Sequence, residues 1–273
     1  IEGDRLAALT GSAAYVMGSL TRRGGAIQPL SFARGLAQKA VAAGAEIYGS
    51  TPALGLERDA RGWSVTTPDG SVVADTVLLC TNGYTDSLWP GLARSVVSLT
   101  SVQVASEPLP DDVRDSILPG GHTLSDTRRT ILYGRREPDG RMVLGSIGQG
   151  DAGTTPDFRR LRREAVRIFP QLAGATWRHE WGGRVAITED NLPHLHEPAP
   201  GLLVGLGYNG RGVAMATVMG RLLAERALGK AASDLPIPTT PVRPYPFGAY
   251  TGFGLPLAIA WMGLRDRIDR IIG

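Results

Sequence analysis

The sequence predicts an α/β chain into which an antiparallel sheet with helices is inserted. A continuous apolar strand, a glycine-rich loop and a long helix follow one another from Leu202 to Leu228, which is a strand–helix unit of an α/β layer. Between Ser95 and Ala186, strand-like segments are instead separated by turn signals such as Pro138-Asp139-Gly140. That second pattern is typical of antiparallel hairpins, so we expect it to form an inserted domain.

The first long helix is predicted to begin at Pro29, because proline suits a position whose N–H has no helical partner. Leu30 and Leu36 then fall on one face, and Gly44 ends the helix. A strand is expected at 45–49. A meander of three short strands, joined by turns at 59–62 and 68–70, is expected at 54–58, 63–67 and 71–74. The apolar run 76–81 predicts a strand covered on both faces.

The middle and end of the chain contain further strands and three helices. Strands are expected at 96–106, 130–136, 142–148, 177–186 and 202–206. The helices are expected at 157–169, between Pro156 and Pro170, at 213–228 and at 255–272. Along the second of these helices small residues recur every fourth position, at Gly212, Ala216, Gly220 and Ala224. Such a ridge allows close approach to a sheet or to another backbone.

Composition narrows the function classes. The chain has 273 residues, of which 42% are hydrophobic and 20% charged, as in a soluble protein of one large or two modest domains. The net charge is +3, but basic residues are scattered without interleaved aromatics, so nucleic acid is not expected as a partner. Cys80 is the only cysteine, which precludes an internal disulfide, and we expect it to be buried as a small apolar residue.

No segment predicts a membrane span or a secretion signal. The longest apolar stretch, near Leu255 to Leu264, is too short to cross a bilayer. The first residues do not resemble a signal peptide, so a cytoplasmic location is the default expectation.

The loop from Gly207 to Gly212 has the strongest local pattern for ligand binding. Its glycines allow close backbone approach, and the following helix N-terminus offers free N–H donors and partial positive charge. An anionic or electron-accepting group is favoured there, although packing alone explains such a turn about as well. The loop is not a phosphate-binding P-loop, because no Lys-Ser/Thr pair follows it. His194, His196 and Glu197 alternate near prolines and indicate a loop or strand edge rather than a metal site.

Four separated segments resemble one family. They are Gly24 to Pro29, Val77 to Tyr84, Trp181 to Arg184 and Gly205 to Gly220. Their order and spacing are similar to those of the D-amino-acid-oxidase-like FAD-dependent oxidoreductases, which include glycine oxidase, sarcosine oxidase and γ-glutamylputrescine oxidase. The resemblance implies a Rossmann-like FAD-binding domain with an inserted antiparallel-sheet substrate domain. It also implies oxidation of the C–N bond of an amine or amino acid by hydride transfer to flavin N5.

The resemblance further implies which residues meet the FAD. Ala53 matches a position whose backbone contacts the adenine, and Gly182 and Gly183 match residues near the flavin ring. The loop along the diphosphate and ribityl chain would be Thr81, Asn82 and Gly83. The loop and helix start at the pyrimidine edge of the ring would be Gly207, Tyr208, Asn209, Gly210, Arg211, Gly212 and Val213. A helix N-terminus there stabilises the negative charge of reduced flavin; for Asn82 and Tyr84, turn chemistry and packing are the alternative.

One departure from the family pattern concerns the substrate. Amino-acid oxidases of the family often have Trp-x-Gly-x-Arg-Pro, in which the arginine grips the substrate carboxylate. Here Val185 stands at that position and Arg184 one residue earlier, which in a strand is the other face. The segment therefore looks more like the γ-glutamylputrescine oxidase branch and favours an amine. Tyr133, Arg135 and Arg184 are the candidate substrate-side residues, with sheet packing and surface ion pairs as the alternative, and no catalytic residue is assigned.

The expected domain order follows from this resemblance. We expect a substrate-domain entry, part of the FAD domain, the substrate domain, a return to the FAD domain with the flavin-facing loop, and a Pro-rich tail with a final helix. Their ranges are 1–24, 25–94, 95–186, 187–235 and 236–273. The family's N-terminal βαβ unit with its G-x-G-x-x-G turn is expected before Ile1, supplied by a missing segment or by a separate subunit.

Without that unit we expect the FAD domain to be partial. The chain alone should bind FAD poorly, be inactive and associate through exposed apolar surface. The alternative is a non-catalytic, partner-binding subunit or remnant of the same fold. A weaker possibility is membrane association through the amphipathic C-terminal helix, for which liposome pelleting with and without residues 247–273 is the test.

Overall fold

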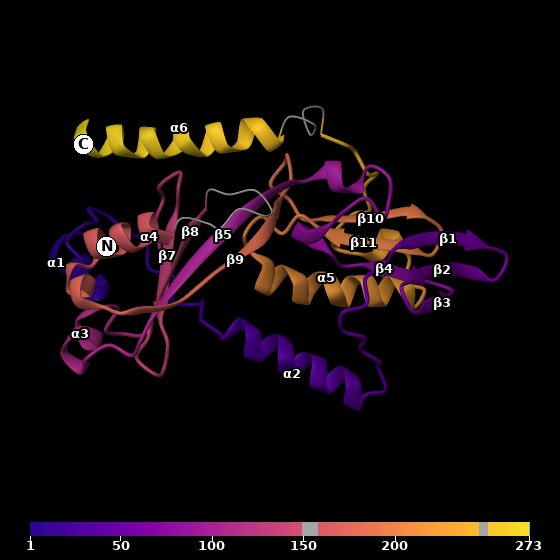
Figure 1. Ribbon diagram of the computed structural model, residues 1–273, viewed down its shortest axis with the longest axis horizontal. Coiled ribbons are helices and arrows are strands. Elements are labelled where there is room, and N and C mark those ends of the chain that lie inside the picture. Colours follow the sequence, from indigo (N-terminus) through magenta and orange to yellow (C-terminus); the bar gives the residue numbers. More distant parts are fainter. Residues whose placement is uncertain (149–157, 246–250, 273) are drawn as a thin grey trace. The chain divides into compact units, whose positions relative to one another are not determined.

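The computed structural model describes residues 1–148, 158–245 and 251–272 (Figure 1). The chain divides into two compact units. Unit 1 contains Ile1–Ile27, Thr100–Gly183 and Gly252–Gly273, and unit 2 contains Gln28–Leu99 and Arg184–Thr251. The chain passes between them inside the strands β5 (Val97–Ser106) and β9 (Trp177–Ile187). The C-terminal helix groups with unit 1, whereas the sequence predicted a separate tail.

Unit 1 is built on a five-stranded sheet in the order β6-β7-β8-β5-β9. Its shorter strands are β6 (Leu124–Ser125), β7 (Leu132–Arg136) and β8 (Met142–Ile147). The pairs β6–β7, β7–β8 and β5–β8 are antiparallel. The hairpin turn between β7 and β8 is confirmed, and Gly140 has the φ of 86° that favours glycine there.

The core of unit 1 lies on one face of this sheet. Alternation along β5 turns Val102 and Val104 toward the core and Ser101 and Gln103 to the opposite face. The helix α4 (Phe158–Ile168) covers the core face, and Pro170 follows it as predicted. The expected helix start at Pro156 and Asp157 lies outside the described residues. The smaller helices of unit 1 are α1 (Gly3–Thr10), α3 (Asp111–Ser116) and the 3-10 turn η3 (Pro170–Gly174).

The C-terminal helix α6 (Thr251–Ile272) runs along unit 1 (Figure 1). Asp266 anchors it, because this buried carboxylate accepts hydrogen bonds from Thr130 N at 2.9 Å, Thr130 Oγ1 at 2.7 Å and Arg129 N at 3.1 Å. Ile259 lies on the same buried face, whereas Trp261 is 60% exposed. Among the helices in the described ranges, none is long and apolar enough to cross a membrane.

Unit 2 contains two small sheets. The predicted meander is confirmed as the antiparallel strands β1 (Gly55–Asp59), β2 (Gly62–Thr67) and β3 (Gly70–Ala74). The second sheet has the order β10-β11-β4, formed by β10 (His194–Ala199), β11 (Leu202–Leu206) and β4 (Val77–Leu79). The pair β11–β4 is parallel and β10–β11 is antiparallel. The 3-10 turns of this unit are η1 (Asn82–Tyr84), η2 (Leu92–Ser95) and η4 (Ala232–Asp234).

The helices of unit 2 differ in how much they bury. The helix α5 (Gly212–Ala227) packs on the fully buried strand β11 through Met219, Leu222 and Leu223. Its small-residue ridge faces outward, since Ala216, Gly220 and Ala224 are exposed. The helix α2 (Pro29–Ala42), which begins at the predicted proline, has no buried residue at all. Leu30, Leu36 and Val41 are each more than half exposed.

Three predictions for unit 2 were wrong. Residues 45–49 form no strand, and Ile47 is exposed, so none of the hydrogen-bonded neighbours that a strand requires is present in the described part of the chain. The run 76–81 yields only the three residues of β4, and Leu78 is exposed rather than covered on both faces. Cys80 is exposed too, because β4 ends before it.

Candidate functional site

Three segments of unit 2 converge at one end of the β10-β11-β4 sheet. They are residues 81–84 after β4, residues 184–188 at the end of β9, and residues 207–212 between β11 and α5. β4 and β11 are parallel neighbours, so the loops that follow them leave from the same edge of the sheet, where ligands bind in open α/β sheets. The contacts within this set decide what the edge can hold.

Asn82 ties the first loop to the third. Its Oδ1 atom accepts a hydrogen bond from Gly207 N at 3.0 Å. Its backbone has a φ of 44°, a left-handed conformation that asparagine tolerates better than most residues. Gly207 has a φ of 77°, and a Cβ there would lie 2.3 Å from Thr188 Cγ2, so only glycine fits.

Gly83 and Tyr84 tie the first loop to the second. A Cβ on Gly83 would lie 2.5 Å from the carbonyl oxygen of Arg184, so this contact also requires glycine. Tyr84 Oη accepts a hydrogen bond from Arg184 N at 3.3 Å, and the guanidinium carbon of Arg184 lies 5.8 Å from the centre of the Tyr84 ring. A cation–π contact of this kind contributes about 0.5–1 kcal/mol at an exposed site. It orients the Arg184 side chain.

Asn209 holds the third loop in shape. Its Oδ1 accepts from Thr188 N at 2.9 Å, its Nδ2 donates to Gly207 O at 2.5 Å, and its backbone N donates to Ala186 O at 3.1 Å. The preceding Tyr208 is buried, and its hydroxyl donates to Gly205 O at 3.2 Å. Burial raises the pKa of Tyr208 to about 12, so the phenol is neutral at physiological pH.

The start of α5 is left open by this arrangement. Arg211 at its N-cap makes no capping side-chain hydrogen bond within the described residues. Apart from the adjacent backbone, no described atom lies within 4 Å of where a Cβ of Gly210 or Gly212 would be. The first N–H groups of a helix lack intrahelical partners, and they carry the positive end of the helix dipole. An electron-rich planar edge therefore fits here, and the pyrimidine edge of a flavin ring is such a group.

The glycine spacing of the same loop extends back into β11. Gly205, Gly207 and Gly210 follow G-x-G-x-x-G, the spacing of dinucleotide-binding turns. Gly205 lies inside β11, however, and a Cβ there would lie 2.4 Å from Met219 Cγ, so its role is close packing of strand and helix. Within the described residues the sheet contains no strand after α5, so no βαβ unit is completed here.

The remaining predicted cofactor residues lie outside this convergence. Ala53 is half-buried just before the meander of unit 2. Gly182 and Gly183 belong to the part of β9 in unit 1, where a Cβ on Gly182 would lie at an ordinary 3.4 Å from Ser101 O. Thr81 is exposed, and its hydroxyl lies 2.7 Å from that of Thr85.

A polar cluster on the sheet of unit 1 surrounds the predicted Tyr133. Its Oη lies 2.5 Å from Ser101 Oγ, and Gln103 Nε2 donates to Ser101 Oγ at 2.6 Å and to Tyr133 Oη at 2.7 Å. A Cβ on Gly145 would overlap the Tyr133 ring at 2.3 Å, so glycine lets the ring lie across β8. Ser101 and Gln103 were missed, although their alternation with Val102 and Val104 marks a polar face.

Arg135, the other predicted residue of this sheet, is already paired. Its Nη2 atom lies 2.6 Å from Glu137 Oε1, so it already has an acidic partner. The three residues considered for a metal have separate partners: His194 contacts Asp190 at 3.1 Å, His196 Nδ1 donates to Thr240 O at 2.7 Å, and Glu197 pairs with Arg226 at 2.9 Å. Both histidines lie in the edge strand β10.

Residues 1–226 match the family described as FAD dependent oxidoreductase, abbreviated DAO. The chain therefore belongs to this family, and the predicted resemblance is confirmed. FAD is the cofactor of the family, and the open loop at α5 is compatible with it.

Two relatives match nearly the whole of this chain. The chain is 35% identical over 259 residues to a probable oxidoreductase OrdL of Rhizobium meliloti, with 94% of this chain and 60% of the relative covered. It is 27% identical over 261 residues to the gamma-glutamylputrescine oxidoreductase of Escherichia coli, with 93% and 60% covered. The chain thus spans about 60% of the length of these two relatives.

The fold is also similar to solved structures. Glycine oxidase from Geobacillus kaustophilus aligns with a TM-score of 0.63 at 24% identity, over 76% of this chain and 56% of that one. L-proline dehydrogenase from P. horikoshii aligns with a TM-score of 0.59 at 22% identity, over 77% and 57%. At these identities the likeness establishes the fold and leaves the substrate open.

Proposed function

We propose that this chain forms the flavin-facing loop and the substrate sheet of an FAD-dependent oxidoreductase that oxidises the C–N bond of a small amine. The convergence of Asn82, Arg184 and Gly207 beside the open start of α5 carries the proposal. When bound, FAD would supply the oxidising chemistry by taking up a hydride from the carbon of the C–N bond. The protein's own contribution is to hold the ring and orient the substrate.

For the ring, the loop of unit 2 offers backbone rather than side-chain chemistry. The N–H groups of Gly212 and Val213, at the start of α5, would stabilise the negative charge of a reduced flavin, and the helix dipole acts in the same sense. Asn82 and Asn209 hold the start of this loop, because Asn82 accepts from Gly207 N and Asn209 donates to Gly207 O. The loop is thus ordered before the cofactor arrives, which lowers the entropic cost of binding it.

For the substrate, the neutral cluster on the sheet of unit 1 favours an amine over an amino acid. Ser101, Gln103 and Tyr133 offer oxygen acceptors to an ammonium group. Of the two candidate arginines, Arg135 is bound to Glu137, so it is not free to grip a carboxylate. Arg184, in the part of β9 that belongs to unit 2, lies over the Tyr84 ring. The domain assignment follows: unit 1 carries the substrate side and unit 2 the cofactor side.

We further propose that another polypeptide segment covers unit 2 in the active enzyme. The apolar side chains of α2, the small-residue ridge of α5 and Leu78 of β4 are exposed, and surfaces of this kind mark an interaction site. A segment carrying the βαβ unit would bury them and supply the diphosphate site. By this reasoning the chain alone retains little FAD and associates with itself.

The reaction is tested by supplying that segment. The chain is mixed with the part of the Rhizobium meliloti relative that lies outside the matched region, together with FAD. A flavin absorbance band that co-purifies with the complex, and bleaches with polyamines, supports the proposal. Failure of the complex to bind FAD favours the alternative, a non-catalytic subunit of the same fold, and tight stoichiometric FAD on the chain alone contradicts the need for a second segment.

Three variants of the reconstituted enzyme separate amine from amino-acid recognition. Gln103→Leu and Tyr133→Phe are expected to raise KM for the best polyamine roughly tenfold, since each removes a hydrogen bond to a charged group. Arg135→Gln is the matched control and is expected to leave KM unchanged. If Arg135→Gln raises KM while Gln103→Leu does not, the substrate is gripped by its carboxylate and the amine assignment is wrong.

A further inference from the structure

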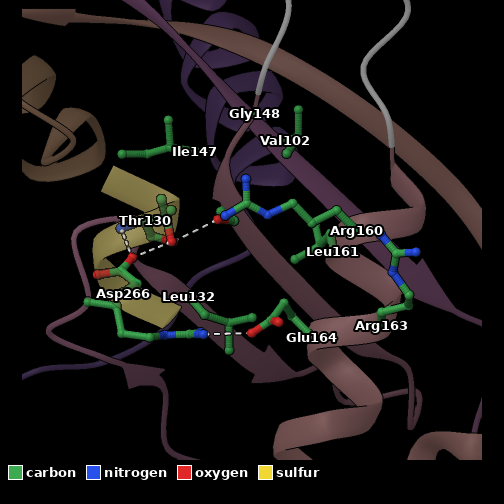
Figure 2. Close-up of a pocket in the computed structure, with 13 residues that line it drawn as sticks. Val102, Thr130, Leu132, Ile147, Gly148, Arg160, Leu161, Arg163, Glu164 and Asp266 are labelled. Carbon is green, nitrogen blue, oxygen red and sulfur yellow. Dashed lines mark hydrogen bonds and ion pairs between the residues drawn. The ribbon is translucent and has the colours of Figure 1, made fainter. Parts of the chain in front are cut away.

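A cavity of about 340 Å³ lies inside unit 1, between α4, the core face of the sheet and the C-terminal helix α6 (Figure 2). Val102, Leu132 and Leu161 form its apolar wall. Val102 and Leu132 belong to the face of the sheet that carries the core, whereas Ser101 and Gln103 lie on the opposite face. The cavity is therefore separate from the cluster proposed to meet the substrate.

The acidic residues that line this cavity are already neutralised. Glu164 accepts from Arg128 at 2.7 Å and from Arg167 at 3.0 Å, and Asp266 is bonded to Arg129 and Thr130. Burial alone would raise the pKa of Glu164, but the hydrogen bonds from Arg167 and Arg128 hold it below its ordinary value. Both carboxylates are thus ionised and fully engaged, and neither balances an additional cation.

Two arginines that line the cavity have no acidic partner in the part of the chain that the structure describes. Arg160 and Arg163 lie one turn apart on α4, and among the described residues neither has an ion pair. Figure 2 shows the Arg160 side chain extending across the cavity toward Thr130, while Arg163 lies at its side. A Cβ on Gly263 of α6 would lie 2.9 Å from Arg160 Nη2, so glycine at this position leaves room for the guanidinium.

We propose that this cavity binds a small organic carboxylate with a short hydrocarbon chain. The planar fork of Arg160 pairs with a carboxylate through two parallel hydrogen bonds, and Val102, Leu132 and Leu161 receive the hydrocarbon. The cavity volume lies at the lower end of small-molecule sites, which matches a ligand of few atoms. The apolar wall disfavours phosphate, which has no hydrocarbon to bury. This inference does not depend on FAD binding by unit 2.

Calorimetric titration of the full chain with hexanoate tests the proposal, with hexanamide as the uncharged twin of the same shape. Hexanoate is expected to bind at least tenfold more tightly than hexanamide, because only the anion forms charge-assisted hydrogen bonds with Arg160. Arg160→Gln is expected to weaken hexanoate binding at least tenfold. Arg5→Gln, which removes an exposed charge from α1, is the matched control and should change nothing.

A second variant keeps the test decisive if Arg160→Gln folds poorly. Gly263→Leu retains both arginines but fills the space beside Arg160, so it should also abolish hexanoate binding. Equal binding of hexanoate and hexanamide, undiminished binding by Arg160→Gln or Gly263→Leu, or displacement of hexanoate by equimolar phosphate would each overturn the proposal. Circular dichroism of every variant shows whether a lost signal reflects the site or the fold.

Discussion

Replacing Asp266 with alanine should release the C-terminal helix α6 from unit 1. Among the residues that the structure describes, the Asp266 carboxylate is the acceptor for Thr130 N, Thr130 Oγ1 and Arg129 N. Thr130 is buried, so two of these donors lose their partner away from water. Each unsatisfied buried donor costs roughly 1–3 kcal/mol, and the pair therefore costs about 2–6 kcal/mol.

Amide hydrogen exchange measures how much local stability α6 loses when these hydrogen bonds are removed. A loss of about 4 kcal/mol corresponds to roughly a thousandfold faster opening, with the local stability of the helix as the upper limit. We expect α6 between Ile259 and Asp269 to lose protection, while β7 and β8 keep theirs. Asp269→Ala is the control, because Asp269 is half exposed and makes one surface ion pair with Arg129 at 2.5 Å, worth about 0–1 kcal/mol.

Equal acceleration of exchange in α6 by both substitutions would show that the buried carboxylate of Asp266 is not the anchor of the helix. If Asp266→Ala loosens β7 and β8 as much as α6, the carboxylate supports the whole unit rather than anchoring one helix.

Other predictions concern backbone, pH and buried phenols. Gly83→Ala places a Cβ 2.5 Å from a main-chain oxygen and should lower stability by about 1–3 kcal/mol in urea unfolding, whereas Gly35→Ala, in open space on α2, should raise it by about 0.5–1 kcal/mol; equal effects would contradict the packing argument. Burial alone would raise the pKa of Asp266, but hydrogen bonds from Thr130 and Arg129 hold it below its ordinary value. A lowered folded pKa contributes stability above the ordinary value that is lost as pH falls through the folded one, so the urea midpoints of the protein and Asp266→Asn should converge on acidification; a constant gap would refute this. Burial raises the pKa of Tyr15 and of Tyr208 to about 12, and only the Tyr15 hydroxyl lacks a partner among the described residues, so Tyr15→Phe should leave the melting temperature unchanged or higher while Tyr208→Phe lowers it.

Elements with strong local signals were predictable from the sequence. β11 is a continuous apolar run that ends at a glycine loop, and it is fully buried as expected. The hairpin around Gly140 and the helix that begins at Pro29 also follow from local chemistry, since turn residues and an N-terminal proline act within a few positions. In these segments local preference and the tertiary structure agree.

The errors occurred where structure depends on a neighbour. Residues 45–49 have a strand-like pattern, but no strand in the described part of the chain pairs with them. β4 is shorter than the apolar run 76–81, because its neighbour β11 pairs with only three residues of that run. Cys80 was expected to be buried because it belongs to the same apolar run, but it lies beyond the end of β4 and is exposed. A periodic pattern shows which side chains prefer burial, but it contains no information on what covers them.

At the edge of the β10-β11-β4 sheet, the resemblance to a family predicted which residues form the candidate site, but it did not predict the contacts between them. The order of the segments around Asn82, Arg184 and Gly207 indicated that they act together, yet no local pattern specifies the bond from Gly207 N to Asn82. The cluster around Tyr133 could have been found from the alternation of Ser101 and Gln103 along β5. The role of Arg160 could not have been predicted from the sequence. Its availability to bind a carboxylate depends on the fact that neighbouring arginines already pair with Glu164.

The hydrogen bonds at the open edge of unit 2 also have a consequence for folding kinetics. The bond from Gly207 to Asn82 joins positions 125 residues apart, and the bond from Arg184 to Tyr84 joins positions 100 apart. Contacts of such long sequence separation form slowly, because the entropy of closing the intervening loop is lost before the contact stabilises anything. The meander β1–β2–β3, whose strands are sequence neighbours, should therefore form early, and the edge proposed to meet the flavin should be among the last parts to become ordered.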